Sequence, residues 1–195
     1  MKSYFKSKYF ILGTYFLFLQ FLILFVNYRF VDFQVHFWFC NHISLILAFA
    51  FLFKKYQVIK GVISVGLIPQ LIWVVDFLLL YFLDIPLFGV TSYVLDLQGF
   101  AFATTVIVHF FSTFVALAFT YKEPIKKESI YYGLAYGFLL IISTLLFTGR
   151  EHNVNCVYYL CGFENLTIPF YPYFMPFIGI ILLVFSGYYI QKWLR

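Results

Sequence analysis

Charged side chains are scarce in this chain. Asp, Glu, Lys and Arg make up 11% of its 195 residues, whereas hydrophobic residues make up 64%. So few charges leave too little polar surface to coat a soluble globule of this length. The chain also lacks internal repeats, low-complexity tracts and long linkers, so nothing suggests a second domain. The sequence therefore excludes an ordinary soluble fold and predicts one integral membrane domain over residues 1–195.

Cysteine is scarce too, and the three cysteines have no spacing typical of a zinc site. Cys156 and Cys161 are separated by four residues, close enough for a disulfide in an oxidising environment. Cys40 lies in a hydrophobic stretch and is left unpaired. We therefore expect no metal and no cofactor.

What the chain does have is six long apolar stretches. Crossing a hydrocarbon core of about 30 Å takes roughly 20 helical residues. The stretches are residues 9–26, 37–53, 61–83, 99–121, 129–148 and 173–191. Because they are continuous rather than alternating, the sequence predicts an all-α, polytopic membrane protein: a bundle of six transmembrane helices. Gly133 and Gly137, four residues apart, predict the close approach of another helix of the same chain.

The distribution of positive charge predicts the orientation. When the six stretches are threaded alternately, eleven of the thirteen Lys and Arg residues fall on one side. They are Lys2, Lys6, Lys8, Lys54, Lys55, Lys60, Lys122, Lys126, Lys127, Lys192 and Arg195. By the positive-inside bias this side is cytoplasmic, and both termini lie there. The net charge of +5 thus reports topology, not nucleic-acid binding. We expect membrane lipids as partners and the cell membrane as location; the oligomeric state stays open.

Polar residues inside the apolar stretches carry the functional argument. An ionisable group near the bilayer centre costs at least about 2.5–3.5 kcal/mol on insertion scales unless it is partnered or hydrated. These residues are His36 at the start of the second stretch with Cys40, Asn41, His42 and Ser44 inside it, Gln70, Trp73 and Asp76 in the third, and Thr104, Thr105, His109, Ser112 and Thr113 in the fourth. With the inferred orientation, Cys40, Asp76, Thr105 and His109 share a depth in the outer half. The cytoplasmic halves carry few polar residues, which favours a cavity open to one side only.

The segment after the fifth stretch is rich in hydrogen-bonding groups. It contains Arg150, Glu151, His152, Asn153 and Asn155, and it is longer than a simple connector needs to be. One interpretation is a lid over the outer mouth of the bundle; the other is an exposed ion pair with Asn residues that cap a helix end. Asn165-Leu166-Thr167 is a glycosylation sequon on the outer side, meaningful in a eukaryotic secretory host.

Three elements of this pattern occur in the order of a known family. They are Trp38-Phe39-Cys40-Asn41-His42 in the second stretch, Val108-His109-Phe110-Phe111 in the fourth, and the Asn-rich segment after the fifth. In this order the chain resembles the YwaF-like integral membrane proteins. That family is part of a group similar to the AIG-like membrane hydrolases and to a vertebrate acyltransferase, in which a Thr or Cys nucleophile works with an intramembrane His on lipid esters. The resemblance implies that Cys40 is the nucleophile and His109 the base.

These assignments predict acyl transfer or ester hydrolysis on a lipid that enters from the outer leaflet. A thiol buried in hydrocarbon needs an adjacent base to become a nucleophile. Asp76 would orient the imidazole, and Asn41 or Gln70 would donate to the developing oxyanion. Trp73 and Thr105 would line the site. Glu151, His152 and Asn153 would bind a headgroup.

Three other functions stay open at this point. Asp76, His109, His42 and Gln70 would suit a hydrated path for protons or a small solute. Alternatively, His36 or His42 would ligate haem or a metal together with His109. The third is a noncatalytic assembly partner, in which the polar residues only hold the helices together.

Overall fold

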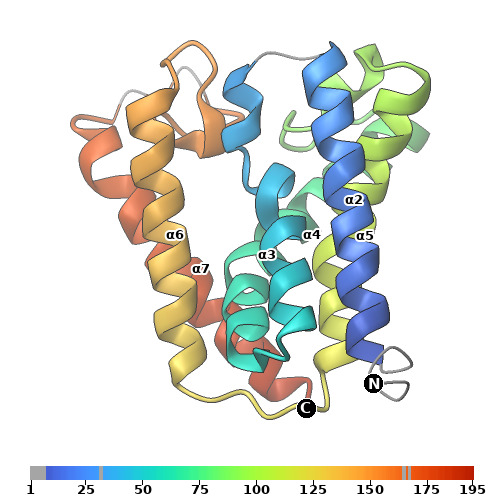
Figure 1. The fold of residues 1–195 in the computed structure, drawn as a ribbon. Helices are drawn as coiled ribbons and strands as arrows, with labels where there is room; N and C mark the ends of the chain where they lie inside the picture. Colours follow the sequence, from blue (N-terminus) through green and yellow to red (C-terminus); the bar gives the residue numbers. More distant parts are fainter. Residues whose placement is uncertain (1–7, 31–32, 164–165, 167) are drawn as a thin grey trace.

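The computed structural model describes residues 8–30, 33–163, 166 and 168–195, and every regular element in them is helical. Figure 1 shows the resulting bundle. Its α-helices are α2 (Lys8–Phe30), α3 (Phe39–Leu52), α4 (Tyr56–Leu83), α5 (Gly99–Thr120), α6 (Glu128–Phe147) and α7 (Tyr171–Trp193). Three short 3₁₀ helices connect them, η1 (Phe33–Phe37), η2 (Ser92–Asp96) and η3 (Val154–Cys156). The sequon residues Asn165 and Thr167 lie outside the described part of the chain.

Five helices are long and apolar enough to cross a membrane, as is typical of an integral membrane protein. They are α2, α4, α5, α6 and α7, and their bounds lie within a few residues of the predicted stretches. The exception is the predicted second span, residues 37–53. η1 ends at Phe37, Trp38 has an extended backbone, and α3 covers only 14 residues. At 1.5 Å per residue α3 is about 21 Å long, shorter than the hydrocarbon core of about 30 Å.

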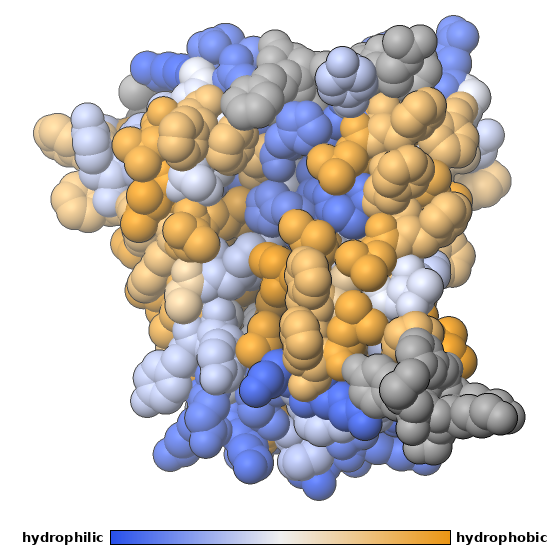
Figure 2. Space-filling model, viewed as in Figure 1, coloured by the Kyte–Doolittle hydropathy of each residue, from blue (hydrophilic) through white to orange (hydrophobic). Residues whose placement is uncertain are grey.

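The two ends of the bundle differ in charge. The start of α2, the α3–α4 and α5–α6 connections and the end of α7 lie together, and we call this the basic end (Figure 1). Its described cations are Lys8, Lys54, Lys55, Lys60, Lys122, Lys126, Lys127, Lys192 and Arg195. The opposite end holds the α4–α5 and α6–α7 connections, and we call it the cap end. In Figure 2 hydrophilic surface lies at both ends and an apolar belt lies between them.

Helix α4 packs against α3, α5, α6 and α7, and glycines bring two of these helices close. A Cβ on Gly61 would lie 2.6 Å from the backbone oxygen of Ser129 and 2.8 Å from the backbone nitrogen of Gly133. A Cβ on Gly137 would lie 2.4 Å from the side chain of Ile180 in α7. The predicted close approach at Gly133 and Gly137 is therefore confirmed, and both contacts lie within one chain.

Gly187 of α7 provides a direct test of this packing. A Cβ there would lie 2.3 Å from the backbone oxygen of Ser64, whereas a Cβ on Gly179 of the same helix meets nothing within 4 Å. We expect Gly187→Ala to destabilise the protein by about 1–3 kcal/mol, because the backbone of α4 cannot move aside without strain. Gly179→Ala is the matched control, since it adds the same methyl group without a clash. Thermal unfolding in detergent checks the pair, and equal melting temperatures would contradict the close α4–α7 contact.

Candidate functional site

The candidate site begins where α3 begins, inside the bundle rather than at its end (Figure 1). The extended backbone of Trp38 stops the helix from starting earlier. The first free N–H group, that of Phe39, donates to Oδ1 of Asn155 at 2.9 Å. A helix needs such partners at its N-terminus, because its first N–H groups have none within the helix. A residue more than a hundred positions away therefore sets the start of α3.

Asn155 connects three parts of the molecule. Besides accepting from Phe39, its Nδ2 donates to the backbone oxygen of Phe37 at 2.6 Å and to Oγ1 of Thr144 in α6 at 2.9 Å. The backbone of Asn155 has φ of 54°, a left-handed conformation that Asn tolerates better than most residues. Asn155 thus joins the cap end, the start of α3 and α6.

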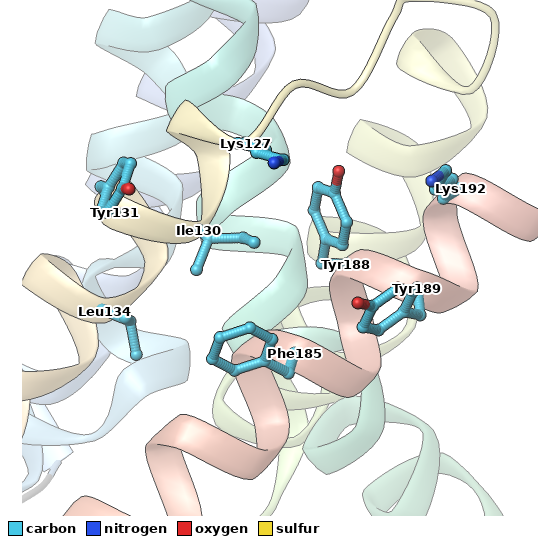
Figure 3. Close-up of a pocket in the computed structure, with 8 residues that line it drawn as sticks. All are labelled: Lys127, Ile130, Tyr131, Leu134, Phe185, Tyr188, Tyr189 and Lys192. Carbon is cyan, nitrogen blue, oxygen red and sulfur yellow. The ribbon is translucent and has the colours of Figure 1, made fainter.

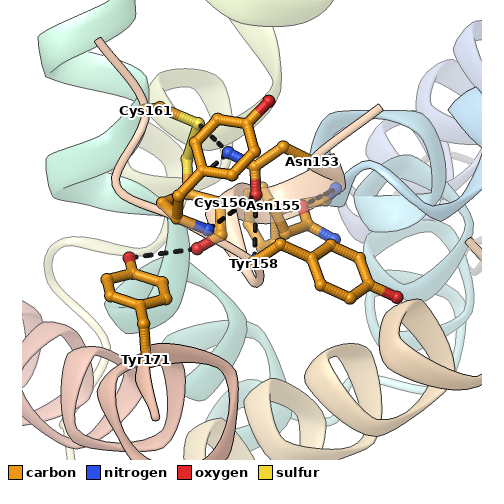
Figure 4. Close-up of a disulfide and its surroundings, with 8 residues drawn as sticks. Asn153, Asn155, Cys156, Tyr158, Cys161 and Tyr171 are labelled. Carbon is orange, nitrogen blue, oxygen red and sulfur yellow. Dashed lines mark hydrogen bonds between the residues drawn. A yellow bond between two sulfur atoms is a disulfide. The ribbon is translucent and has the colours of Figure 1, made fainter. Parts of the chain in front are cut away.

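The segment that carries Asn155, residues 148–163, forms a compact cap, which we call the cap loop (Figure 4). A disulfide joins Cys156 and Cys161, a bond that their spacing allows and that the sequence alone left open. Oδ1 of Asn153 accepts from the backbone N–H groups of Tyr158 and Tyr159 at 2.9 and 3.1 Å, and its Nδ2 donates to the backbone oxygen of Tyr159 at 2.9 Å. Asn153 therefore holds the loop together from inside, whereas sequence reasoning had assigned it to a headgroup.

Further bonds attach the cap loop to α6 and α7. The Tyr158 hydroxyl contacts the backbone oxygen of Leu145 in α6 at 3.4 Å and that of Thr148, just after α6, at 2.6 Å. The Tyr171 hydroxyl of α7 donates to the backbone oxygen of Cys156 at 3.1 Å (Figure 4). Glu151 and His152, the other two predicted headgroup ligands, are exposed, and their side chains lie 3.9 Å apart. Asn155 holds the loop against the start of α3, and internal hydrogen bonds fix the shape of the loop. The lid interpretation stays a prediction.

Cys40 lies in the first turn of α3 and is partly exposed. Its sulfur is 3.8 Å from Oδ1 of Asn41. His42 points elsewhere, because its Nδ1 is 2.9 Å from the hydroxyl of Tyr136 in α6. In Figure 2 hydrophilic side chains interrupt the apolar belt in the half nearer the cap end. Four polar residues within or beside the first turn of α3 are partly exposed: His36, Asn41, His42 and Asn155, the last of which is placed there by its bond to Phe39.

His109 of α5 is buried against Trp73 of α4. The two rings stack with centroids 3.8 Å apart, and Nδ1 of His109 is 2.8 Å from the backbone oxygen of Thr105. A carbonyl oxygen only accepts, so Nδ1 carries the proton in this arrangement and Nε2 is left as the basic nitrogen. Thr105 thus contributes its carbonyl group, one turn before His109.

Trp73 joins His109 to the 3₁₀ helix η2. Nε1 of Trp73 donates to the hydroxyl of Tyr93 in η2 at 3.4 Å. Burial of that hydroxyl raises the pKa of Tyr93, and the nearby Cys40 thiol adds to the rise. Within the described residues no hydrogen bond joins Cys40 to His109 or to His42, so the predicted nucleophile–base contact is not formed in this structure.

Asp76 has different hydrogen-bond partners from the one predicted. It is completely buried, its Oδ1 accepts from the backbone N–H of Phe88 at 2.6 Å, and its Oδ2 accepts from the N–H and hydroxyl of Thr91 at 3.0 and 2.8 Å. The reason is local: α4 ends at Leu83, and the left-handed backbone of the next residue, Asp84, turns the chain back over the helix. Asp76 therefore anchors the α4–α5 connection, and its hydrogen bonds do not include the predicted one to His109.

Three buried polar groups near the site have no hydrogen-bond partner among the described residues. They are Oγ of Ser44 in α3, Oε1 of Gln70 in α4 and Oγ1 of Thr113 in α5. Gly66 of α4 provides the room between these helices, because a Cβ there would lie 3.1 Å from Oγ1 of Thr113 and 2.4 Å from the ring of Phe39. Of the predicted substrate-binding residues, Gln70 thus keeps an unused acceptor inside the bundle.

Sequence reasoning missed Gln20 of α2. Its Nε2 donates to the backbone oxygen of Asn41 at 2.9 Å, and its Oε1 accepts from the N–H of Leu45 at 3.0 Å. These are the two groups that would pair with each other in a regular helix. The amide therefore ties α2 to the first turns of α3. A lone Gln in an otherwise apolar stretch is the signal that would have found it.

The expectation of few polar groups in the half toward the basic end is wrong. Lys60, Ser64 and Gln191 are all buried there. Nε2 of Gln191 donates to Oγ of Ser64 at 2.8 Å and to the backbone oxygen of Lys60 at 3.0 Å, which joins α7 to α4. These residues lie near the ends of the apolar stretches, where polar side chains are expected to be exposed to solvent.

Among the residues that the structure describes, no group of three or more His, Cys, Asp or Glu is placed to hold a metal ion. No family model, curated protein or solved structure matches this chain. The resemblance to the YwaF-like proteins stays a prediction that rests on the three sequence elements alone.

Proposed function

We propose that the chain crosses the membrane six times, with α3 as a short span and with the basic end in the cytoplasm. The clustering of Lys and Arg at one end supports this orientation. The disulfide between Cys156 and Cys161 lies at the other end, and disulfides persist in oxidising compartments outside the cytoplasm. We assign the protein to the cell membrane, with its cap end outside.

In this orientation, we propose, the protein is an acyltransferase or hydrolase that acts on lipid esters of the outer leaflet. One observation carries the proposal: the free thiol of Cys40 lies in the first turn of a helix that begins within the bundle, beside partly exposed polar residues. The N-terminus of a helix favours negative charge, which suits both a thiolate and the oxyanion of an ester under attack. The apolar belt on both sides of this polar region gives acyl chains a place to lie (Figure 2).

The reaction would run in two steps. The Cys40 sulfur attacks the ester carbonyl, so that a carbon–sulfur bond forms, the carbon–oxygen bond breaks, and the thiol proton reaches the leaving alcohol through a base. Water or an acceptor alcohol then releases the acyl group from the thioester. We assign the base to His109, because its Nε2 is not used by the contact with Thr105. For this step the imidazole must come within hydrogen-bond reach of the thiol, a contact that is not formed in this structure.

The proposal predicts a covalent acyl group on Cys40. Purified protein incubated with an alkyne-tagged phospholipid should gain a label that hydroxylamine removes, as expected for a thioester. Cys40→Ala should abolish the label and lower ester turnover by about 10³-fold or more, as for other catalytic nucleophiles. Ser44→Ala, one turn further along α3, is the control and should retain both. Turnover by Cys40→Ala at the wild-type rate would remove the enzymatic mechanism.

The two histidines near the thiol allow the base to be tested separately. His109→Gln should slow acylation by about 10²–10⁴-fold, the usual contribution of a general base. His42→Gln removes an imidazole of the same depth whose Nδ1 contacts Tyr136, and it should leave acylation within a few-fold of wild type. The reverse pattern would move the base from His109 to His42.

A further inference from the structure

A groove lies between α6 and α7 at the basic end, away from Cys40, and its cavity volume is about 380 Å³. Lys127 lines it from the residue before α6, and Lys192 lines it from the last turn of α7. Figure 3 shows both amines, together with the hydroxyl of Tyr188, toward one end of the groove. Both lysines are exposed, and the residues that line the groove include no Asp or Glu in the described part of the chain. This end of the groove is therefore positive.

The rest of the groove is apolar. Ile130, Leu134 and Phe185 line it further along the two helices, toward the middle of the bundle (Figure 3). Tyr131 and Tyr189 flank it and are 70% and 60% exposed. Tyrosines in such positions are typical of the level at which lipid headgroups meet hydrocarbon. A molecule that fits the groove needs an anionic head and an apolar chain.

We propose that this groove binds one anionic phospholipid of the cytoplasmic leaflet, with its phosphate between Lys127 and Lys192 and an acyl chain along Ile130, Leu134 and Phe185. Charge complementarity supports this occupant, because two cations converge on a mouth without a carboxylate. The cavity volume is within the range of small-molecule sites, about 300–1,000 Å³, and suits a headgroup with the first part of one chain. The site is independent of the proposed chemistry at Cys40, which lies in the half of the bundle nearer the cap end.

Competition between two lipids with identical acyl chains tests the proposal. Purified protein in detergent is given equal amounts of phosphatidylglycerol and phosphatidylcholine, and native mass spectrometry counts the bound molecules. We expect the wild type to retain phosphatidylglycerol selectively. Because each Lys near an anionic surface changes affinity about fivefold, Lys127→Gln with Lys192→Gln should weaken phosphatidylglycerol binding by about 25-fold.

Matched variants separate the groove from general surface charge. Lys55→Gln with Lys126→Gln removes two exposed cations from the same end that do not line the groove, and it should change binding by less than about twofold. Lys127→Arg with Lys192→Arg keeps the charge and should keep the affinity. Equal retention of the two lipids by the wild type, or an equal loss in the Lys55/Lys126 variant, would overturn the proposal. So would displacement of the bound lipid by glycerol phosphate alone, which has the charge but no acyl chain.

Discussion

Replacing Asp76 by alanine should lower the free energy of unfolding by about 3 kcal/mol or more, because three hydrogen bonds to a completely buried carboxylate are lost together. Two of the donors are backbone N–H groups, of Phe88 and Thr91, and Thr91 is itself buried. Leaving such donors without acceptors adds their desolvation penalty to the loss of the bonds. Thermal unfolding in detergent measures the total effect. Hydrogen exchange at the amides of Phe88 and Thr91 locates it.

Two further variants separate the anchoring role of Asp76 from a role in chemistry. Asp96→Ala removes an exposed carboxylate from the same connection and should have an effect within about 0.5 kcal/mol. Asp76→Asn keeps the shape of the side chain but turns one acceptor into a donor. It should therefore destabilise the protein nearly as much as Asp76→Ala does. If Asp76 anchors the loop and does not orient His109, the Asn variant should keep its ester turnover per folded molecule. Wild-type stability with lost turnover would instead restore the catalytic assignment.

The five long apolar helices were predictable because their signal is local. Apolar runs bounded by charges gave the bounds of α2, α4, α5, α6 and α7 to within a few residues, and the spacing of Gly133 and Gly137 indicated where helices meet. The sequence also showed that a disulfide was possible, since two cysteines in one short loop have few other partners. In each case neighbouring residues determine the outcome.

The contacts of the candidate site were not predictable, because depth in the membrane does not determine rotation or pairing. Asp76 and His109 do share a level, yet the first accepts from the loop after α4 and the second stacks on Trp73. The start of α3 depends on Asn155, and four α-helices separate Asn155 in the sequence from the residues that it holds there. An apolar run of 17 residues gave no sign that its first part would be 3₁₀ helix and extended backbone.

The start of α3 should also be the most sensitive point of the cap end. Replacing Asn155 by alanine removes all three of its hydrogen bonds and places an alanine at φ of 54°, which costs about 1–2 kcal/mol by itself. With the lost bonds, we expect a total destabilisation of about 3–5 kcal/mol. The first turn of α3 should then fray, and Cys40, the one thiol outside the disulfide, should react faster with a soluble maleimide.

Two other substitutions of Asn155, by glycine and by aspartate, separate the contribution of backbone strain from that of the lost hydrogen bonds. Asn155→Gly loses the same bonds without backbone strain, so it should be more stable than Asn155→Ala by about 1 kcal/mol. Asn155→Asp keeps the acceptor for the N–H of Phe39 and loses only the donations to Phe37 and Thr144. Cys40 should therefore react with maleimide more slowly in this variant than in the Ala and Gly variants. If all three variants label Cys40 at the wild-type rate, the helix start is held by something other than Asn155. The thiol would then owe its position to the bonds between Gln20 and α3, and the cap loop would have no part in the site.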